Sequence, residues 1–374
     1  MGWRISTIFI VGGDHFRPAG GSIRTRPDVT LVCPGQVQEQ PMTVSEDFAS
    51  VADRYRTELL AHCYRMLGSF DEAEDLVQET YLRAWRSFDG FEGRSSVRTW
   101  LYRIATNVCL TAIERRGRRP LPSGLGAGSL DPETPLVSGP EVPWLQPLPD
   151  PLMVSDREDP ATVTAARAGI RLAFVAALQY LSPRQRAMLI LRDVLEWPAA
   201  EVAALLGTTT TAVNSGLRRA RAQVSEATPA EDEVAEPAEA SQRALVDRFA
   251  TAIERADVGA LADLLREDVT LEMPPELTWF AGRAAVTAYA AAHLLAEPGL
   301  LRVIPVVANS EPALATYAGK PGGPHRAHSV LALTVTATGI ARIVSFRGPS
   351  LFASFGLPLE YPESGQEPLR TLRS

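Results

Sequence analysis

The chain has 374 residues, 45% of them hydrophobic, which is enough for two or three domains with ordinary cores. Its 37 basic and 44 acidic residues give a formal net charge of -7, so indiscriminate coating of nucleic acid is excluded and any DNA contact is confined to local basic patches. Cys33, Cys63 and Cys109 are widely spaced, which predicts neither a disulfide framework nor a metal site and fits a reducing cytoplasm.

The first 42 residues are rich in glycine and proline and show no helical period. They are expected to be a disordered arm, or an artefact of start-site choice if translation begins at Met42. No small-residue cleavage site follows the short apolar run near Met1, so we expect no signal peptide. No apolar run approaches the roughly 18 residues of a membrane span, and no membrane partner is expected.

Helical periodicity begins near residue 48 and runs to Met66, and Gly68 stands where a left-handed helix end is needed. Ser69 and Glu72 then form a capping box for a second helix that reaches Trp85. One face of that helix carries an acidic stripe with an exposed leucine: Asp75, Gln78, Glu79 and Leu82. The stripe is either a partner surface or a set of acidic groups that complements the helix dipole.

A third helix follows Gly93, with Ser95 or Ser96 as its cap. Its apolar positions predict a buried stripe, and the opposite side carries Arg98, Tyr102, Arg103, Thr106 and Asn107. The helix ends in four guanidiniums, from Arg115, Arg116, Arg118 and Arg119. Such a cluster is typical of phosphate binding, although basic residues also suit helix C-termini.

A proline-rich linker at 120–160 should run extended, because it cannot fold alone. Residues 142–149 are too apolar for a spacer, so this run docks either on a partner or on its own protein.

A second helical block covers 161–228. Ser182, Pro183 and Gln185 form a capping box with proline at the first helical position. Residues 198–221 predict a helix-turn-helix with Gly207 in the turn, although a generic helical hairpin is the alternative. Its second helix offers Thr210, Thr211, Asn214, Ser215 and Arg218 to a major groove and Arg219 and Arg221 to phosphates.

These two blocks together resemble the sigma-70 family of bacterial RNA polymerase initiation factors, in particular its extracytoplasmic-function group. The resemblance covers about residues 48–228 and implies a protein that binds core RNA polymerase and promoter DNA without catalysis or a cofactor. It implies that the acidic stripe contacts the polymerase clamp, and that the third helix lies near the melted element through Arg98, Trp100, Arg103, Thr106 and Asn107. The chain departs from the family at Asn214 and Gly216, where basic residues are frequent, so the promoter sequence does not follow.

After an acidic linker at 229–242, helices precede strands at 269–273, 313–317, 329–336 and 340–346. This order predicts an α+β cone at 243–360, followed by a tail at 361–374. Residues 256–286 resemble SnoaL-like domains of the nuclear-transport-factor-two-like fold. That fold hosts both enzymes and non-enzymatic pockets, and candidate polar groups are Asp263, Asp268, Glu272, Tyr289, His293, Tyr317 and His328. In a sigma factor the resemblance implies a regulatory module that acts through a small molecule or through intramolecular contacts.

The expected fold is therefore two all-α regions, a bundle at 43–119 and a helix-turn-helix at 161–228, followed by the α+β domain. The function that fits best is a transcription initiation factor with a fused regulatory domain. Two alternatives remain: a ligand-responsive helix-turn-helix regulator, and a SnoaL-type isomerase or cyclase fused to DNA-binding domains. The block at 75–119 argues against the helix-turn-helix regulator, because a simple regulator has no use for it. The isomerase or cyclase requires a carboxylate and a proton donor that converge in one pocket.

Overall fold

The computed structural model describes residues 53–91, 95–149, 169–227 and 239–361. The expected arm at 1–42, the first part of the first helix, the end of the proline-rich linker, most of the acidic linker and nearly all of the tail lie outside these residues. No helix among the described residues is long and apolar enough to cross a membrane.

Three helices form the first region: α2 (Arg56–Leu67), α3 (Phe70–Ser87) and α4 (Val97–Arg116), with a 3-10 turn at Phe88–Gly90. Gly68 ends α2 with a left-handed φ of 71°, as predicted. The Ser69 side chain accepts a hydrogen bond from the Glu72 amide, and Ser96 rather than Ser95 caps α4. These local signals fix where each helix begins.

The second region contains α6 (Leu172–Leu178), α7 (Pro183–Leu189) with a π-helical extension at Ile190–Val194, α8 (Ala199–Leu205) and α9 (Thr210–Ala227). Both hydrogen bonds of the predicted capping box between Ser182 and Gln185 are present. Gly207 has a φ of 59° between α8 and α9, so the predicted helix-turn-helix is confirmed.

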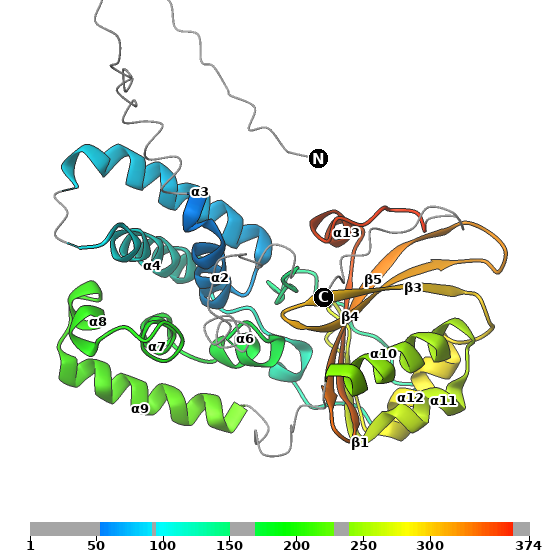
Figure 1. Ribbon diagram of the computed structural model, residues 1–374. Helices are drawn as coiled ribbons and strands as arrows, with labels where there is room; N and C mark the ends of the chain where they lie inside the picture. The colour runs from blue at the N-terminus through cyan, green and yellow to red at the C-terminus, as the bar shows by residue number, and fades with distance from the viewer. Residues whose placement is uncertain (1–52, 92–94, 150–168, 228–238, 362–374) are drawn as a thin grey trace, which may run out of the picture. The chain divides into compact units, whose positions relative to one another are not determined.

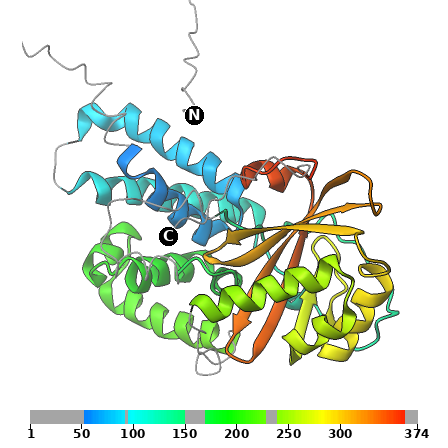
Figure 2. The same ribbon diagram turned by 45° about the vertical axis from the view of Figure 1, so that its right-hand side comes forward.

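The C-terminal domain begins with α10 (Glu239–Glu254) and α11 (Val258–Leu264), and α12 (Arg283–His293) follows its first two strands. Its sheet has the order β2-β1-β6-β5-β4-β3, from β1 (Leu265–Glu272), β2 (Phe280–Ala281), β3 (Leu301–Ala308), β4 (Glu311–Gly319), β5 (His325–Thr336) and β6 (Gly339–Arg347). Only the β1–β6 pair is parallel. The two ribbon views show α10, α11 and α12 on one side of this sheet (Figures 1 and 2). The expected SnoaL-like α+β arrangement is confirmed.

The helix α13 (Ser350–Ser354) packs on part of the opposite face of the sheet, and Ala332, Val344 and Phe346 of the sheet belong to the core of the helical regions. Phe352 is fully buried and lies edge-on to Tyr317, with 5.1 Å between the ring centroids. The apolar segment at 352–358 therefore folds onto its own domain.

The proline-rich linker is not a free strap over the part that the structure describes. Leu145 and Leu148 are 1% and 0% exposed, and the Gln146 amide donates to the Gly68 carbonyl over 3.0 Å. Ser123 donates its backbone N–H to Glu272 of β1 over 2.8 Å. The apolar run at 142–149 thus docks on its own protein.

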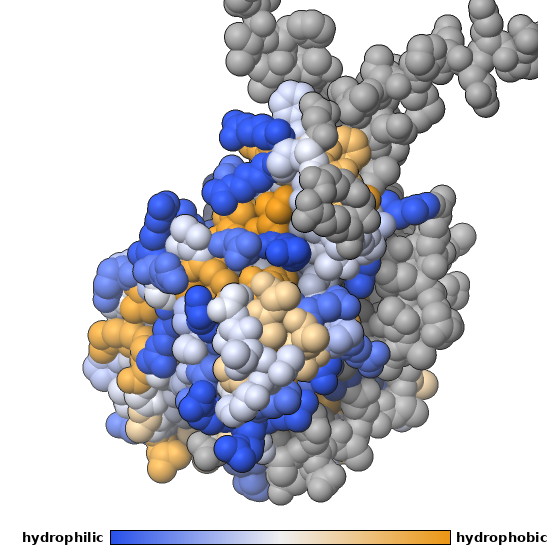
Figure 3. Space-filling view, turned by 90° about the vertical axis from the view of Figure 1, so that its left-hand side faces the viewer, coloured by the Kyte–Doolittle hydropathy of each residue, from blue (hydrophilic) through white to orange (hydrophobic). Residues whose placement is uncertain are grey.

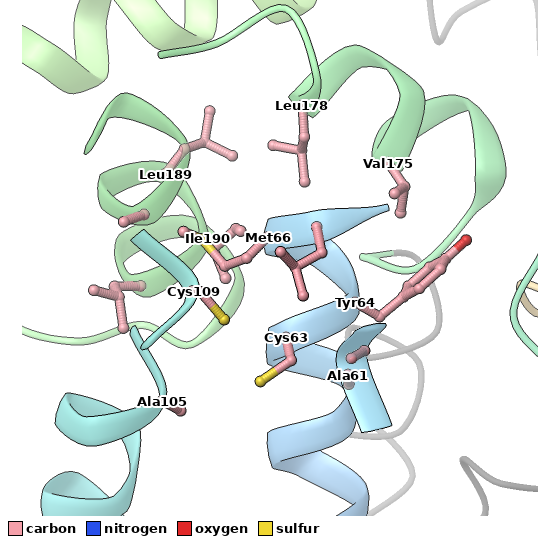
Figure 4. Close-up of a cluster of buried hydrophobic side chains, with 14 of the residues drawn as sticks. Ala61, Cys63, Tyr64, Met66, Ala105, Cys109, Val175, Leu178, Leu189 and Ile190 are labelled. Atoms are coloured by element: carbon pink, nitrogen blue, oxygen red, sulfur yellow. The ribbon is translucent and has the colours of Figure 1, made fainter. Parts of the chain in front are cut away.

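One hydrophobic core joins the first and second helical regions. Cys63 and Met66 of α2 and Cys109 of α4 belong to the same buried cluster as Leu178 of α6 and Ile190 beyond α7. Figure 4 shows these side chains facing a common interior from both regions. The two regions are therefore packed together in this structure.

Candidate nucleic-acid interface

The exposed face of α3 carries the acidic stripe that the sequence predicts. Asp75 and Gln78 are exposed, and the Glu79 carboxylate pairs with Arg83 over 2.7 Å on the helix surface. The opposite face of α3 is buried through Ala73, Val77, Thr80 and Ala84. The helix thus presents a polar stripe outward while its apolar side holds it in the bundle.

Two large apolar side chains interrupt this polar surface. Leu82 is 49% exposed and Trp85 is 57% exposed. Figure 3 shows apolar patches among hydrophilic side chains on one face of the molecule. Large exposed apolar groups next to charged ones are typical of a protein-binding surface.

The residues predicted on the outer side of α4 fall into two groups. Arg103 and Asn107 are exposed. Arg98 instead pairs with the Glu58 carboxylate of α2 over 2.7 Å and lies over the Tyr102 ring, 5.0 Å from its centroid. Arg98 therefore also ties α4 to α2.

Trp100 is half-buried at the start of α4. Its ring lies 4.9 Å from that of Phe91 and 6.2 Å from that of Phe88, measured between centroids. This aromatic cluster offers a partly exposed stacking surface at the N-terminal end of the helix.

The placement of Thr106 and Tyr102 on the outer side of α4 is wrong. Both residues are fully buried, and the Thr106 hydroxyl donates to the Tyr102 carbonyl over 2.7 Å. The same hydroxyl lies 3.0 Å from Nε2 of His62, itself fully buried. Thr106 is a polar core residue that bridges α4 and α2, so it is not available to DNA.

The arginine cluster at the end of α4 is divided between surface and linker. Arg115, Arg116 and Arg118 are exposed, whereas the Arg119 side chain is only 14% exposed. Arg116 and Arg119 both pair with the Glu72 carboxylate, and Arg119 donates to the Trp144 carbonyl over 3.0 Å. Arg119 is thus an anchor for the linker, with little surface left for a phosphate.

Helix α9 exposes the face predicted for a major groove. Thr210, Thr211, Asn214, Arg218 and Arg219 are exposed, and Ser215 is half-buried. Val213, Leu217 and Ala220 are buried on the opposite face.

Two other residues of α9 have structural contacts. Arg221 forms two hydrogen bonds with the Asp193 carboxylate, at 2.8 and 2.7 Å. A Cβ at Gly216 would lie 2.6 Å from Sδ of Met188, so the glycine permits close packing of α9 on α7. This contact explains why no large basic residue stands at position 216.

A buried arginine fastens the two helical regions together. Arg186 of α7 is 1% exposed, and its Nη1 donates to the Met66 carbonyl of α2 and, over 2.8 Å, to the Gln179 side chain. Burial lowers the pKa of Arg186 to about 10, so the guanidinium stays charged at neutral pH. Separating the first region from the second would take the Met66 carbonyl away from this buried charge, which is costly in a core.

Sequence reasoning missed Asn309, a buried polar residue in the turn between β3 and β4. The residue is fully buried; its Nδ2 donates to the Tyr64 hydroxyl of α2 over 2.8 Å and to the Ile170 carbonyl over 2.7 Å. Its Oδ1 accepts from the Leu148 amide of the linker over 3.0 Å. One side chain therefore contacts the first region, the linker and the second region.

The same hairpin supplies a second contact. Oε2 of Glu311 accepts a hydrogen bond from the Leu172 amide at the start of α6 over 3.1 Å. Asn309 and Ser310 have φ values of 57° and 59°, as in a two-residue hairpin turn. An asparagine in such a turn was the available signal, but its partners are distant in sequence and only the fold reveals them.

The polar candidates of the C-terminal domain do not converge on one site. Asp263 and Asp268 are exposed, and Glu272 is buried in a pair with Arg342 of β6, with 2.7 Å between Oε1 and Nε. Tyr289 stacks on Phe280 and lies against His293, and Tyr317 packs on the opposite face of the sheet. Of these candidates only His328 lines the apolar cavity of the domain.

No Asp or Glu side chain lines this cavity within the described part of the chain. The carboxylate and proton donor of a cyclase are therefore not brought together there. Over the same residues, no group of three or more His, Cys, Asp or Glu side chains is arranged to hold a metal ion.

Comparison with known proteins decides between the remaining interpretations. Family models match over both helical regions: sigma-70 region 2 over residues 51–119 and sigma-70 region 4 over residues 171–224. The ECF RNA polymerase sigma factor SigG of Mycobacterium tuberculosis is 46% identical over 358 residues, covering 95% of this chain and 96% of the relative. The chain belongs to the ECF sigma factor family.

The likeness extends to the third domain. The ECF sigma factor SigJ of M. tuberculosis is 30% identical over 215 residues, which cover 58% of this chain and 61% of that protein. The crystal structure of SigJ matches 85% of this sigma factor and 100% of its own chain with a TM-score of 0.54 and 23% identity, which shows a common fold. The sigma factor is thus a transcription initiation factor with a C-terminal α+β domain.

Proposed function

We propose that this sigma factor binds core RNA polymerase through α3 and promoter DNA through α4 and α9, while its C-terminal domain holds the two sigma regions closed. The single observation that carries the regulatory part is the contact of Asn309 with both regions and the linker. The β3–β4 hairpin then acts as an intramolecular clasp, defined by Asn309 and Glu311.

The polymerase surface is proposed to be the face of α3 that contains Asp75, Gln78, Glu79 and Leu82. Its exposed apolar and acidic groups support this assignment. Leu82 places a 49% exposed apolar side chain within this polar face, where a partner can cover it.

The DNA surface is proposed to have two parts. Arg103, Asn107 and Trp100 would contact the melted element, supported by the basic end of α4, where Arg115 and Arg118 are exposed. The exposed residues of α9 would contact the upstream element through base edges and phosphates, with Arg218 as the strongest candidate for base recognition.

The closed arrangement is proposed to be a resting state. Regions 2 and 4 share one core, and Arg186 of α7 is bonded to α2, so contacts within the protein hold the two regions together in this state. A protein that reads two separated promoter elements needs the two regions to part. Polymerase binding would then compete with the clasp, which makes the C-terminal domain an inhibitor in this state.

The variant Asn309→Gly tests this proposal. Glycine keeps the positive φ of the turn but removes three side-chain hydrogen bonds. Run-off transcription with core polymerase should yield more promoter-specific transcript from Asn309→Gly than from the wild type. Lys320→Ala, in the exposed turn between β4 and β5, is the matched control and should leave the yield unchanged. An equal or lower yield from a folded Asn309→Gly variant would contradict inhibition by the clasp.

A further inference from the structure

The C-terminal domain contains an apolar cavity of about 60 Å³ between its helices and its sheet. Apolar side chains from α10, α11, α12 and the strands line it, among them Phe249, Leu261, Val286, Leu331 and Ile343. An apolar cavity of this kind stays free of water and is open to a small apolar group.

One end of the cavity is polar. Thr316, His328, Ser329, Ser345 and Arg347 also line it. Burial and the nearby Arg347 lower the pKa of His328, so its ring is neutral at neutral pH. The only cationic side chain at this end is therefore Arg347.

The Arg347 guanidinium is only partly satisfied, although the Tyr289 hydroxyl is one of its hydrogen-bond partners. Its Nε is buried without a hydrogen-bond partner, its Nη1 lies 3.7 Å from the Glu276 carboxylate, and its Nη2 lies 3.7 Å from Sδ of Met273. A charged donor beside an apolar cavity, with an unsatisfied N–H, is stabilised by an anion that reaches it.

Arg347 also borders the contact between the C-terminal domain and the linker. A second cleft, of about 340 Å³, is lined by Arg347 together with Trp144 of the linker and Phe346 of β6. The Arg347 side chain thus borders both the apolar cavity and the cleft next to the linker.

The loop that Arg347 touches is the one that holds the linker. Met273 and Glu276 lie on either side of Pro274 and Pro275. Over this loop the Gly139 amide donates to the Pro275 carbonyl over 2.8 Å, and the Leu277 amide donates to the Val137 carbonyl over 2.6 Å. A change in the partners of Arg347 would therefore act on residues bonded to the linker.

We propose that the cavity and Arg347 form a binding site for a short-chain organic carboxylate, such as butanoate, with its carboxylate on Arg347 and its alkyl tail in the cavity. The small volume of the cavity, about 60 Å³, favours a short alkyl tail over a long one. A tail of about two or three carbon atoms fits that space.

The regulatory consequence rests on the proposed closed state. A carboxylate on Arg347 competes with Glu276, Met273 and the Tyr289 hydroxyl for the guanidinium. The loop at 273–277 then loses a contact that supports its bonds to the linker. Binding therefore favours release of the linker and separation of the two sigma regions.

Isothermal titration of the full chain with butanoate, 1-butanol and butylamine tests the chemistry of the site. Butanoate should bind, and the alcohol and the amine should bind at least about tenfold more weakly, because they lack the charge that pairs with a guanidinium. Equal binding of the alcohol, or no binding of butanoate at millimolar concentration, would overturn the proposal.

Two variants locate the site. Arg347→Gln should weaken butanoate binding by about tenfold or more, and Ala290→Leu should weaken it similarly by filling the cavity while keeping Arg347. Arg326→Gln, whose side chain is 80% exposed on β5, is the control and should bind as the wild type does. Thermal unfolding of each variant identifies any loss of fold. Undiminished binding by folded Ala290→Leu would place the ligand elsewhere and overturn the assignment.

A transcription readout separates this inference from the proposed function. Butanoate should raise the run-off yield of the wild type and leave that of Arg347→Gln unchanged. If Asn309→Gly activates transcription but butanoate does not bind, the clasp stands and the ligand site is wrong. If butanoate binds without any effect on the yield, the site stands and its coupling to the linker is wrong.

Discussion

At the scale of single residues, the interior of region 2 holds polar groups that a surface role would not explain. His62 is fully buried against the Thr106 hydroxyl and the Tyr102 ring, whose centroid lies 5.1 Å from that of the imidazole. Burial, with a smaller effect of Arg65, lowers the pKa of His62 to about 3. The ring is neutral in the folded protein over the whole physiological range.

This pKa predicts how stability depends on pH. Below pH 6.5 the unfolded chain binds a proton at His62, and the folded chain does not until the pH approaches 3. The contribution of His62 to the free energy of unfolding is therefore complete above pH 6.5 and should fall by about 2 kcal/mol between pH 6.5 and 5. Urea unfolding of the wild type and of His62→Gln measures it. A wild-type decline no steeper than that of the variant would contradict the assigned pKa.

Arg218 is the residue on which the proposed base recognition by α9 would depend most. It is exposed on the same face as Asn214, and none of the described residues forms a hydrogen bond or ion pair with its side chain. Arg218→Ala should lower the affinity of the polymerase complex for its promoter by about 1 to 3 kcal/mol if the side chain reads a base. Titration of promoter DNA followed by fluorescence anisotropy measures the change. Gln223→Ala, exposed on α9, is the control, and equal affinities would argue against recognition by this helix.

At the scale of elements, the starts of the helices follow from local sequence signals, whereas some strands depend on tertiary context. Caps at Ser69, Ser96 and Ser182 fixed the helix starts, because each satisfies amides within one turn of its own chain. Strands β2 and β3 are absent from the strands expected from the sequence, and β3 contains Pro305. A proline is tolerated there because β3 is at the edge of the sheet, which the sequence does not disclose.

The exposed face of α3 gives a prediction for a whole element. Leu82→Glu should abolish co-purification of core polymerase, because a charge replaces an apolar group that is 49% exposed in the free protein. The helix itself should persist, since glutamate is a good helix former. Thr111→Glu on the exposed side of α4 is the control. Retention of polymerase by Leu82→Glu at wild-type levels would show that this face is not the interface.

At the scale of the whole molecule, the proposed closure predicts a pH dependence through a carboxyl group between the hairpin and α6. Burial raises the pKa of Glu311 to about 7, although the Leu172 amide opposes the shift. The folded chain therefore binds a proton at Glu311 between pH 4.5 and 7 that the unfolded chain does not. The contribution of the Glu311 carboxyl to the free energy of unfolding is complete below pH 4.5 and is lost as the pH rises through about 7.

The clasp should consequently loosen in mildly alkaline solution. Small-angle scattering is expected to give a larger radius of gyration at pH 8 than at pH 6 for the wild type. In Glu311→Gln the side chain stays neutral, so the difference between the two pH values should disappear. A pH-dependent radius of the same size in the variant would assign the effect to another group.

The sequence by itself determined the elements whose causes are local. Helix caps, the glycine turn before α9, the apolar stripes and the order of the three parts follow from residues within a few positions of one another. The family follows from the same residues, because the order and spacing of the two helical blocks, at 43–119 and 161–228, are specific to sigma factors.

Only the tertiary structure decided which polar residues are internal and which parts are held together. Thr106 and Arg119 have the sequence character of surface groups, yet one bridges α4 to α2 and the other anchors the linker. Asn309 lies 245 positions from Tyr64, to which it is bonded. Contacts over such separations depend on how whole elements pack, and no periodicity or spacing within a segment encodes them.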